Sequence, residues 1–429
     1  MRVSVASLEG PRVLARPDHP VSRRNIDINA VKVLYRLYHA GYQSFLVGGA
    51  VRDLMLGRRP KDFDISTDAR PQQIRRLFRN SRIIGRRFRL VHIYFRGGIV
   101  EVSTFRRQPD PEIQEGGTSE LLITDDNVFG TPEQDAYRRD FTVNALFYSI
   151  GDFSVIDYVE GIEDLERKVI RTIGDPDIRL REDPVRMLRA CELAGRLDFA
   201  IDPATEASIR KYSREIEKAS PARLSEEIGQ ILQSGSSERV LRRALDVGLL
   251  EIFLPEAYTL LTTGEGEAVG FQKVPSILDE MISEGHKISD AALLGALALP
   301  SILLRRQHIE ALDQRPIKRS ALRKLTTDTV DRLATRFNLS RSKTERLQQA
   351  IWSFHRLGER WRGVSSQIQF SRQPGFDDAL ALLEILVRAT GEGQKTLDLW
   401  TRIQESRPQP HPVGSRNRSR RRRRRRQSR

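Results

Sequence analysis

The fold is decided by residues 45–67, which read FLVGGAVRDLMLGRRPKDFDIST. Apolar and small residues lead into Gly48 and Gly49, and an amphipathic segment follows and stops at Gly57. The stretch closes on an Asp-Phe-Asp-Ile run. This order of patterns predicts a strand, a glycine turn, a short helix, a further turn and a second strand.

The glycine turn and the two aspartates predict a site for a phosphate and a cation. Glycines let the backbone approach a phosphate closely, and the helix that follows offers free N–H groups at its positive end. Asp62 and Asp64 are two residues apart, so on a strand both side chains would leave the same face. Two adjacent carboxylates repel unless a cation lies between them, and hard oxygen ligands beside a phosphate indicate Mg²⁺. A surface turn with solvated aspartates would explain either motif alone, but their joint occurrence around Arg52 favours the site.

The basic charge of the chain is concentrated at its C-terminal end. The 429 residues suffice for about two to four domains, and 39% of them are hydrophobic. The formal net charge is +15, yet residues 406–429 hold eleven Arg and no acid, which leaves only +4 for the rest. Such a balance favours a polyanionic partner, nucleic acid first and an anionic membrane second.

The cysteine content and the hydropathy predict a soluble cytoplasmic protein with no membrane partner. Cys191 is the single cysteine, so no disulfide can form within the chain, which fits a reducing compartment. No apolar run approaches the length of a membrane span, and the N-terminus lacks the apolar core of a signal peptide.

The patterns of four further segments in the N-terminal half predict their structure. Residues 1–25 mix Pro, Arg and Ser without a period and predict a flexible arm, whereas apolar spacing from Ile28 to Gly41 predicts a helix. Alternating runs at 90–95 and 99–105 predict a hairpin around Gly97-Gly98. Glu101 in its second strand is either an edge acid that points to water or a third metal ligand. Residues 106–134 show no period and predict a mobile flap over the site.

Two polar motifs follow, DAYRRDFTVNAL at 135–146 and REDPVRMLRA at 181–190. In the first, Asp140 suits either a helix N-cap or a bond to a ribose hydroxyl, and the arginines could pair with phosphate oxygens. In the second, Asp183 suits a cap before Pro184, but Asp183 and Arg186 are also neighbours on one helix face. A carboxylate and a guanidinium placed in this way could read the pairing edge of adenine.

As a set, these motifs resemble the tRNA nucleotidyltransferase/poly(A) polymerase family over residues 26 to about 227. The resemblance implies an α+β fold, in which a nucleotidyltransferase head with a small mixed sheet precedes an all-helical neck and body and a disordered basic tail. The domains it implies are the flexible arm (1–25), the catalytic head (26–160), the neck that recognises the nucleotide base (161–232), the RNA-binding body (233–405) and the Arg-rich tail (406–429).

The resemblance also implies the roles of individual residues. Asp62, Asp64 and Glu101 would be catalytic and hold Mg²⁺, and Asp140 would belong to the catalytic centre. The tail would bind RNA through its seven consecutive arginines, Arg420, Arg421, Arg422, Arg423, Arg424, Arg425 and Arg426. The residues expected to contact ATP are Gly48, Gly49, Arg52, Arg138, Arg139, Asn144, Asp183 and Arg186.

The head motifs alone do not separate poly(A) addition from CCA addition, but two stretches resemble the polymerases. These are LFRNSRIIGRRFRLVH at 77–92 and the PARLSEE element that ends at Glu227. We therefore expect a template-independent polynucleotide adenylyltransferase that extends RNA 3′ ends from ATP by two-metal-ion catalysis. Such tails would mark RNA for decay, with partners in the decay machinery that the sequence does not identify. The alternatives are a CCA-adding enzyme and a catalytically inactive RNA-binding adaptor.

Overall fold

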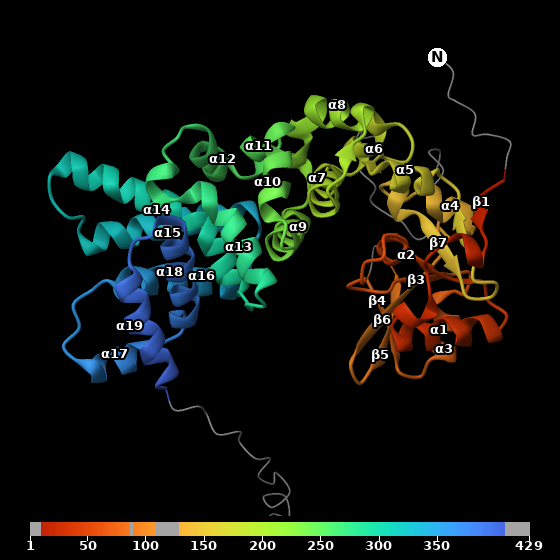
Figure 1. The fold of residues 1–429 in the computed structure, drawn as a ribbon, viewed down its shortest axis with the longest axis horizontal. Coiled ribbons are helices and arrows are strands. Elements are labelled where there is room, and N and C mark those ends of the chain that lie inside the picture. Colours follow the sequence, from red (N-terminus) through yellow and green to blue (C-terminus); the bar gives the residue numbers. More distant parts are fainter. Residues whose placement is uncertain (1–9, 86–88, 108–127, 408–429) are drawn as a thin grey trace, which may run out of the picture. The chain divides into compact units, whose positions relative to one another are not determined.

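The computed structural model describes residues 10–85, 89–107 and 128–407. The described residues form two compact units (Figure 1). Of the described residues, unit 1 comprises 10–85, 89–107, 128–265, 278–286 and 335–339, and unit 2 comprises 266–277, 287–334 and 340–407. None of the helices in the described ranges combines the length and the apolar character that a membrane span requires. The expected RNA-binding arginines Arg420–Arg426 and most of the expected flap lie outside the described residues.

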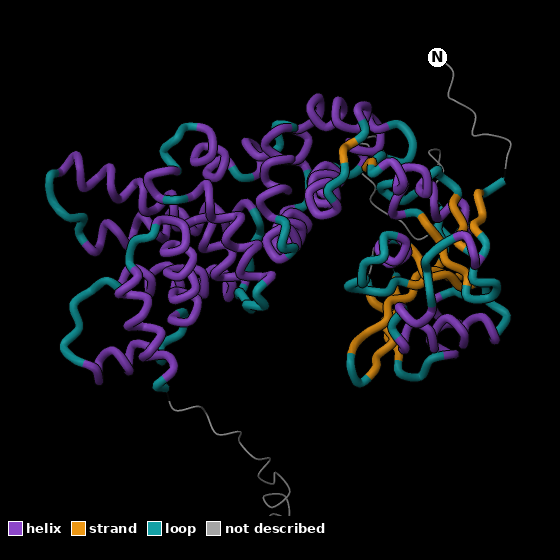
Figure 2. The backbone as a smooth tube through the Cα atoms, in the orientation of Figure 1, coloured by secondary structure: helices purple, strands orange, loops and turns teal. Residues whose placement is uncertain are grey.

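Unit 1 contains an eight-stranded sheet, visible in orange in Figure 2, whose strand order is β1-β8-β7-β2-β3-β6-β5-β4. Strands β3 and β6 run parallel, and the other neighbouring pairs are antiparallel, which confirms the mixed sheet of the head. The strands are β1 (Arg12–Leu14), β2 (Ser44–Val47), β3 (Ile65–Thr67), β4 (Ser81–Ile84), β5 (Leu90–Phe95), β6 (Gly98–Thr104), β7 (Leu146–Ser149) and β8 (Val155–Asp157).

The stretch 45–67 forms β2, a turn, helix α2 (Gly49–Met55) and β3, as predicted. Gly48 and Gly57 adopt φ of +71° and +67°, which suits glycine at both ends of the helix. Asp62 and Asp64, however, do not lie on the second strand. The β2–β3 ladder begins at Ile65, so both aspartates belong to the loop before β3, although the Val47 N–H donates to the Asp64 carbonyl at 3.0 Å directly beside the ladder.

The hairpin and the first helix occur where the sequence places them. Strands β5 and β6 pair with Phe95 opposite Gly98, so the turn is formed by residues 96 and 97 rather than by Gly97-Gly98. Helix α1 (Ile28–His39) is capped by Asp27, whose carboxylate accepts hydrogen bonds from two backbone N–H groups.

The prediction of a flexible arm over residues 1–25 is wrong for its second half. Strand β1 pairs with β8 at the edge of the sheet, and Val21 is fully buried. The physical reason is a long-range pairing, since the strand partner lies more than 140 residues away and leaves no periodic signal at 12–14.

The remainder of unit 1 is helical apart from a two-stranded parallel pair, β9 (Val169–Ile170) and β10 (Ala200–Ile201). That pair is the one departure from the expected all-helical neck. The helices are α3 (Pro71–Leu77), α4 (Pro132–Tyr137), α5 (Gly161–Arg167), α6 (Pro176–Glu182), α7 (Val185–Leu197), α8 (Pro203–Tyr212), α9 (Pro221–Gln233), α10 (Ser237–Asp246), α11 (Leu250–Phe253) and α12 (Pro255–Thr262).

The described part of unit 2 is helical, and its core surrounds Trp400, which is fully buried and donates a hydrogen bond to the Leu357 carbonyl at 2.9 Å. Helix α13 (Val274–Ser283) has residues in both units. The other helices are α14 (Asp290–Asp313), α15 (Arg319–Arg336), α16 (Arg341–Leu357), α17 (Val364–Ser371), α18 (Phe376–Thr390) and α19 (Gln394–Glu405). Short 3-10 turns are η1 (Arg16–Asp18), η2 (Arg23–Asn25), η4 (Thr142–Asn144), η5 (Ser213–Lys218), η6 (Glu267–Val269) and η7 (Phe271–Lys273).

Candidate active site

A cavity of about 910 Å³ in unit 1 gathers the polar motifs of the sequence. Its walls come from the turn before α2, the loop before β3, residues 138–144, and helices α7 and α9. Of the site residues predicted within the described chain, Glu101 alone does not line it. Those that do are Gly48, Gly49, Arg52, Asp62, Asp64, Arg138, Arg139, Asp140, Asn144, Asp183 and Arg186.

The glycine turn is packed closely against arginine. A Cβ atom at Gly48 would lie 3.1 Å from Nη1 of Arg139, and one at Gly49 would lie 3.3 Å from Nη2 of Arg52. Together with the positive φ of Gly48, these distances explain why both positions are glycine. The turn therefore presents bare backbone next to two guanidinium groups, an arrangement suited to phosphate oxygens.

Arg52 is an internal residue of this wall. Its side chain is almost fully buried and lies 2.8 Å from Oδ1 of Asp53, and it also donates a hydrogen bond to Oδ1 of Asn144. Burial lowers the pKa of the Arg52 guanidinium, although the neighbouring Asp53 carboxylate opposes that change. Arg52 thus ties α2 to residue 144 while it lines the cavity.

The three predicted metal carboxylates interact electrostatically. Burial raises the pKa of Asp64 to about 6, with further contributions from the negative charges of Glu101 and Asp62, and Arg139 opposes the rise. Asp64 is nonetheless exposed to solvent where it lines the cavity. Strands β3 and β6 are parallel, and Ile65 pairs with Val102. Asp64 and Glu101 each come directly before one of these paired residues, so they lie on neighbouring segments of the backbone.

The donor chemistry of these residues fits a hard divalent cation. All three offer carboxylate oxygens, and their repulsion is of the kind that a bound cation relieves. Glu101, however, is directed to His92, with Oε1 of Glu101 3.1 Å from Nε2 of His92. Across the described ranges, no three His, Cys, Asp or Glu side chains are arranged to hold a single ion. Asp62, Asp64 and Glu101 therefore fit Mg²⁺ by donor type, without a preformed coordination shell.

Asp140 is buried in a hydrogen-bonded network. Its Oδ1 atom accepts from the backbone N–H of Phe141 at 2.8 Å and from Nδ2 of Asn144 at 3.2 Å, and Oδ2 lies 2.8 Å from Nη2 of Arg189. Burial favours a raised pKa, but Arg189 and these hydrogen bonds together hold the pKa of Asp140 below its ordinary value. The carboxylate is not a helix N-cap, because the short turn η4 begins at Thr142 and has Phe141 at its cap position.

Two site residues on the helical wall were missed in the sequence. Arg189 lies on α7 next to Asp140, and Glu227 lies on α9 with Oε1 4.0 Å from Nε of Arg189. Burial raises the pKa of Glu227 to about 7, an effect that Arg189 opposes. Both residues fall inside motifs quoted above, but no local pattern indicates the contact between them, because they lie 38 residues apart on different helices.

Asp183 forms a bidentate pair with Arg223, with distances of 2.6 and 2.8 Å between guanidinium nitrogens and carboxylate oxygens. Asp183 does not cap α7. The N-cap residue of that helix is Pro184, and no side chain forms a capping hydrogen bond there. Arg186 donates to the backbone carbonyl of Arg179 at 2.8 Å. Arg223 belongs to the PARLSEE element, so this pair joins the two motifs.

Comparisons with known proteins show the family to which the chain belongs. The family model "Poly A polymerase head domain" matches residues 44–171, and the model "Probable RNA and SrmB- binding site of polymerase A" matches 198–260. Poly(A) polymerase I of Salmonella typhi is 37% identical over 406 residues, which cover 92% of this chain and 86% of that protein. The CCA-adding enzyme of Bacillus subtilis is 36% identical over 242 residues, or 56% of this chain and 59% of that enzyme.

Solved structures share the fold. The CCA-adding enzyme of Bacillus stearothermophilus, solved in complex with CTP, matches with a TM-score of 0.60 and 22% identity, covering 88% of this chain and 82% of that one. The fold and the relatives together define a nucleotidyltransferase, which sets aside the inactive adaptor. Within that class, the similarity to the polymerases extends over most of both chains. The chain belongs to the bacterial poly(A) polymerase family.

Proposed function

We propose that this nucleotidyltransferase adds adenylate residues from ATP to RNA 3′ ends, with Mg²⁺ held by Asp62, Asp64 and Glu101. The observation that carries the proposal is the single cavity in which a glycine turn, two aspartates and several arginines meet. Bound Mg²⁺ would lower the pKa of the RNA 3′-hydroxyl and neutralise charge on the triphosphate.

The residues of the chain would bind and align the two reactants. The backbone at Gly48-Gly49 and the guanidinium groups of Arg138 and Arg139 would face the triphosphate oxygens, because they lie on one wall of the cavity. Alignment of the 3′-hydroxyl with the α-phosphate then suffices for in-line attack and release of pyrophosphate, without a covalent enzyme intermediate.

Asp140 is better suited to position its neighbours than to bind a ribose hydroxyl directly. Its Oδ1 atom already accepts two hydrogen bonds, its Oδ2 atom lies beside Arg189 without a hydrogen bond in the described structure, and only 9% of the residue is accessible. Through Asn144 and Arg189 it would fix the two sides of the nucleotide pocket. Base recognition would fall to Asp183 and Arg186, with Arg223 holding the Asp183 carboxylate.

The second candidate is CCA addition, which the match to a CCA-adding enzyme supports over about half of the chain. Poly(A) addition is favoured because the similarity to the polymerases covers 92% of the chain. In this proposal the enzyme acts in the cytoplasm and the added tails direct RNA to decay.

The deciding experiment supplies purified protein with short RNA, Mg²⁺ and each labelled nucleotide separately. Long ladders with ATP alone would support the polymerase, whereas two C residues added with CTP alone, followed by one A when ATP is then supplied, would establish CCA addition instead. Because a CCA end can be completed only on suitable acceptors, the assay should include both an oligoadenylate and a tRNA lacking its terminal nucleotides.

A further inference from the structure

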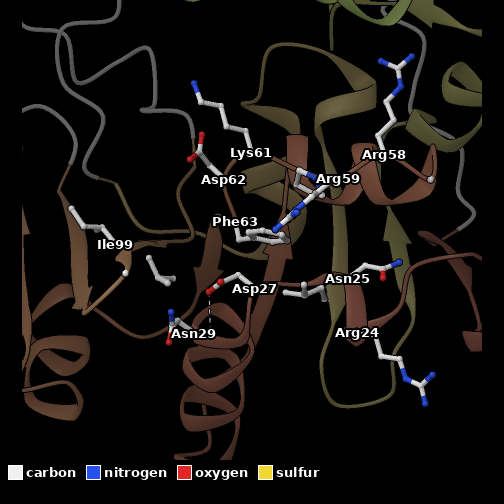
Figure 3. A pocket seen from close by; sticks show the side chains of 16 residues that line it. Arg24, Asn25, Asp27, Asn29, Arg58, Arg59, Lys61, Asp62, Phe63 and Ile99 are labelled. Atoms are coloured by element: carbon white, nitrogen blue, oxygen red, sulfur yellow. Dashed lines mark hydrogen bonds between the residues drawn. The ribbon is translucent and has the colours of Figure 1, made fainter. Parts of the chain in front are cut away.

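A second cavity, of about 770 Å³, adjoins the catalytic one in unit 1. The two cavities share Lys61 and Asp62 in their linings. The second is bounded by residues 24–29 before and at the start of α1, by the loop 57–63, and by the hairpin turn at residues 97–100. In Figure 3, Lys61 and Asp62 lie above Phe63, and Asp27 lies below it at the start of α1.

The lining of this second cavity is positively charged. It contains four cationic side chains, Arg24, Arg58, Arg59 and Lys61, against two acids, Asp27 and Asp62. The Asp27 carboxylate is already engaged as the cap of α1. Arg58 donates to two backbone carbonyls, at 3.3 and 3.4 Å. Within the described ranges, by contrast, the side chains of Arg59 and Lys61 have neither a hydrogen bond nor an ion pair.

The same cavity also offers apolar surface and an open edge. Phe63 is half-buried, and Ile99 is 51% exposed. A Cβ atom at Gly97 or Gly98 would meet no atom within 4 Å, and neither glycine has a positive φ. Packing and backbone conformation therefore do not require glycine at these two positions, and their bare backbone keeps the edge of the cavity open.

We infer that this cavity binds single-stranded RNA immediately behind the 3′ end, with phosphates on Arg59 and Lys61 and a base against Phe63 and Ile99. Cations combined with apolar platforms are the features that bind single strands without sequence preference. The inference rests on the proposed function, because the growing 3′ end must reach Asp62, which both cavities share. Inorganic pyrophosphate or a free triphosphate would need the cations but not the apolar surface.

The test compares Arg59→Glu with Arg75→Glu, a matched charge reversal on α3. Both arginines are exposed, and Arg75 lines neither cavity. We expect Arg59→Glu to raise the KM for an oligoadenylate about five- to tenfold, with the KM for ATP and the kcat at saturating RNA within about twofold. Fluorescence anisotropy with labelled oligoadenylate and no nucleotide should show a salt slope reduced by about 1 relative to Arg75→Glu.

A second variant tests the apolar surface. Ile99→Ala should weaken binding of oligoadenylate more than binding of an abasic ribose-phosphate oligomer of equal length, because only the former offers a base. The inference is overturned if Arg59→Glu and Ile99→Ala both behave like Arg75→Glu, or if the KM for ATP rises while that for RNA does not. Wild-type protein that extends no RNA would refute the proposed function instead, and the anisotropy measurements would still decide what this cavity binds.

Discussion

The two walls of the catalytic cavity each hold an aspartate, and the two pKa values are shifted in opposite directions. On the loop before β3, burial and then the negative charges of Glu101 and Asp62 raise the pKa of Asp64 to about 6, which Arg139 offsets only in part. On the helical wall, burial favours a raised pKa, but Arg189 and two hydrogen-bond donors hold the pKa of Asp140 below its ordinary value. Asp64 thus lacks positive charge that a cation would supply, whereas Asp140 is already paired, even though burial raises the pKa of Glu227 on the same wall to about 7. We infer that the first wall, formed by the turn before α2 and the loop before β3, binds a metal ion. The second wall, formed by Asp140 and helices α7 and α9, holds arginines in place.

The largest expected effect comes from removing a carboxylate of the first wall. Asp64→Ala should reduce nucleotide incorporation by about 10³-fold or more, since stabilisation of charge at the reacting phosphate is lost. RNA binding should stay within about twofold, and thermal stability should not fall, because the substitution removes a repelled charge. Asp68→Ala, which removes an exposed acid just after β3, is the control. Full activity of Asp64→Ala would refute the assignment of this wall to metal binding.

On the second wall, replacing an arginine should lower the stability of the fold. Arg189→Met would leave the Asp140 carboxylate buried without its ion pair. Breaking a fully buried pair costs about 3–5 kcal/mol, but 42% of the Arg189 side chain is accessible, so we expect roughly 2–3 kcal/mol. The shift of the urea midpoint measures this loss.

Two further variants make that measurement decisive. The double variant Arg189→Met/Asp140→Asn should recover most of the lost stability, because the buried Asp140 charge is removed together with its partner. Glu227, the other acid beside Arg189, has a pKa raised to about 7, so it can take up a proton near neutral pH. Arg210→Met breaks an exposed pair with Glu206 and an exposed hydrogen bond to the Asp246 carbonyl, and together these should cost no more than about 1 kcal/mol. Equal midpoints for Arg189→Met and Arg210→Met would mean that the second wall does not depend on charge pairing.

Local patterns in the sequence were enough to predict the first wall. Apolar runs, glycines and acids at 45–67 specify β2, the turn and α2 because each depends on neighbours within one short segment. The placement of Asp62 and Asp64 before the strand was missed, because the start of pairing is set by β2 and not by the pattern of residues 62–67.

The second wall could be predicted only in part. Asp140, Asp183 and Arg186 were identified, but their partners Arg189 and Arg223 were not. The Asp183–Arg223 pair spans forty residues, and which arginine meets which acid depends on how α7 and α9 pack. The strand at 12–14 was missed for the same reason, since its partner lies more than 140 residues away in sequence.

Lowering the pH should weaken Mg²⁺ binding at Asp64 by about tenfold. The folded pKa of Asp64, about 6, lies above its ordinary 3.8, so the proton is retained until the pH rises past 6. Mg²⁺ needs the deprotonated carboxylate, and its affinity should therefore fall about tenfold between pH 7 and pH 5. In the absence of metal, the same raised pKa means that Asp64 reduces stability as the pH rises from about 4 to 6.

Thermal denaturation with and without Mg²⁺ measures both effects, since a ligand that binds the folded state raises the Tm. The Mg²⁺-induced rise in Tm should shrink below pH 6 in the wild type, and it should be small at every pH in Asp64→Ala. A rise that is independent of pH would place the cation away from Asp64.

The smallest effect is expected from Arg223→Ala, which frees the Asp183 carboxylate on the second wall. We expect the Asp183 carboxylate to help select adenine only while Arg223 fixes its direction. The preference for ATP over CTP should therefore fall about fivefold in Arg223→Ala. This value lies at the low end of what a bidentate contact to a base contributes. The measurement is the ratio of kcat/KM for the two nucleotides. The control is Arg242→Ala, which breaks an exposed ion pair with Glu238 on α10. Equal losses of activity with both nucleotides would show that Arg223 has only a structural role. A changed ratio with unchanged stability would instead show that the Asp183–Arg223 pair helps to select the base.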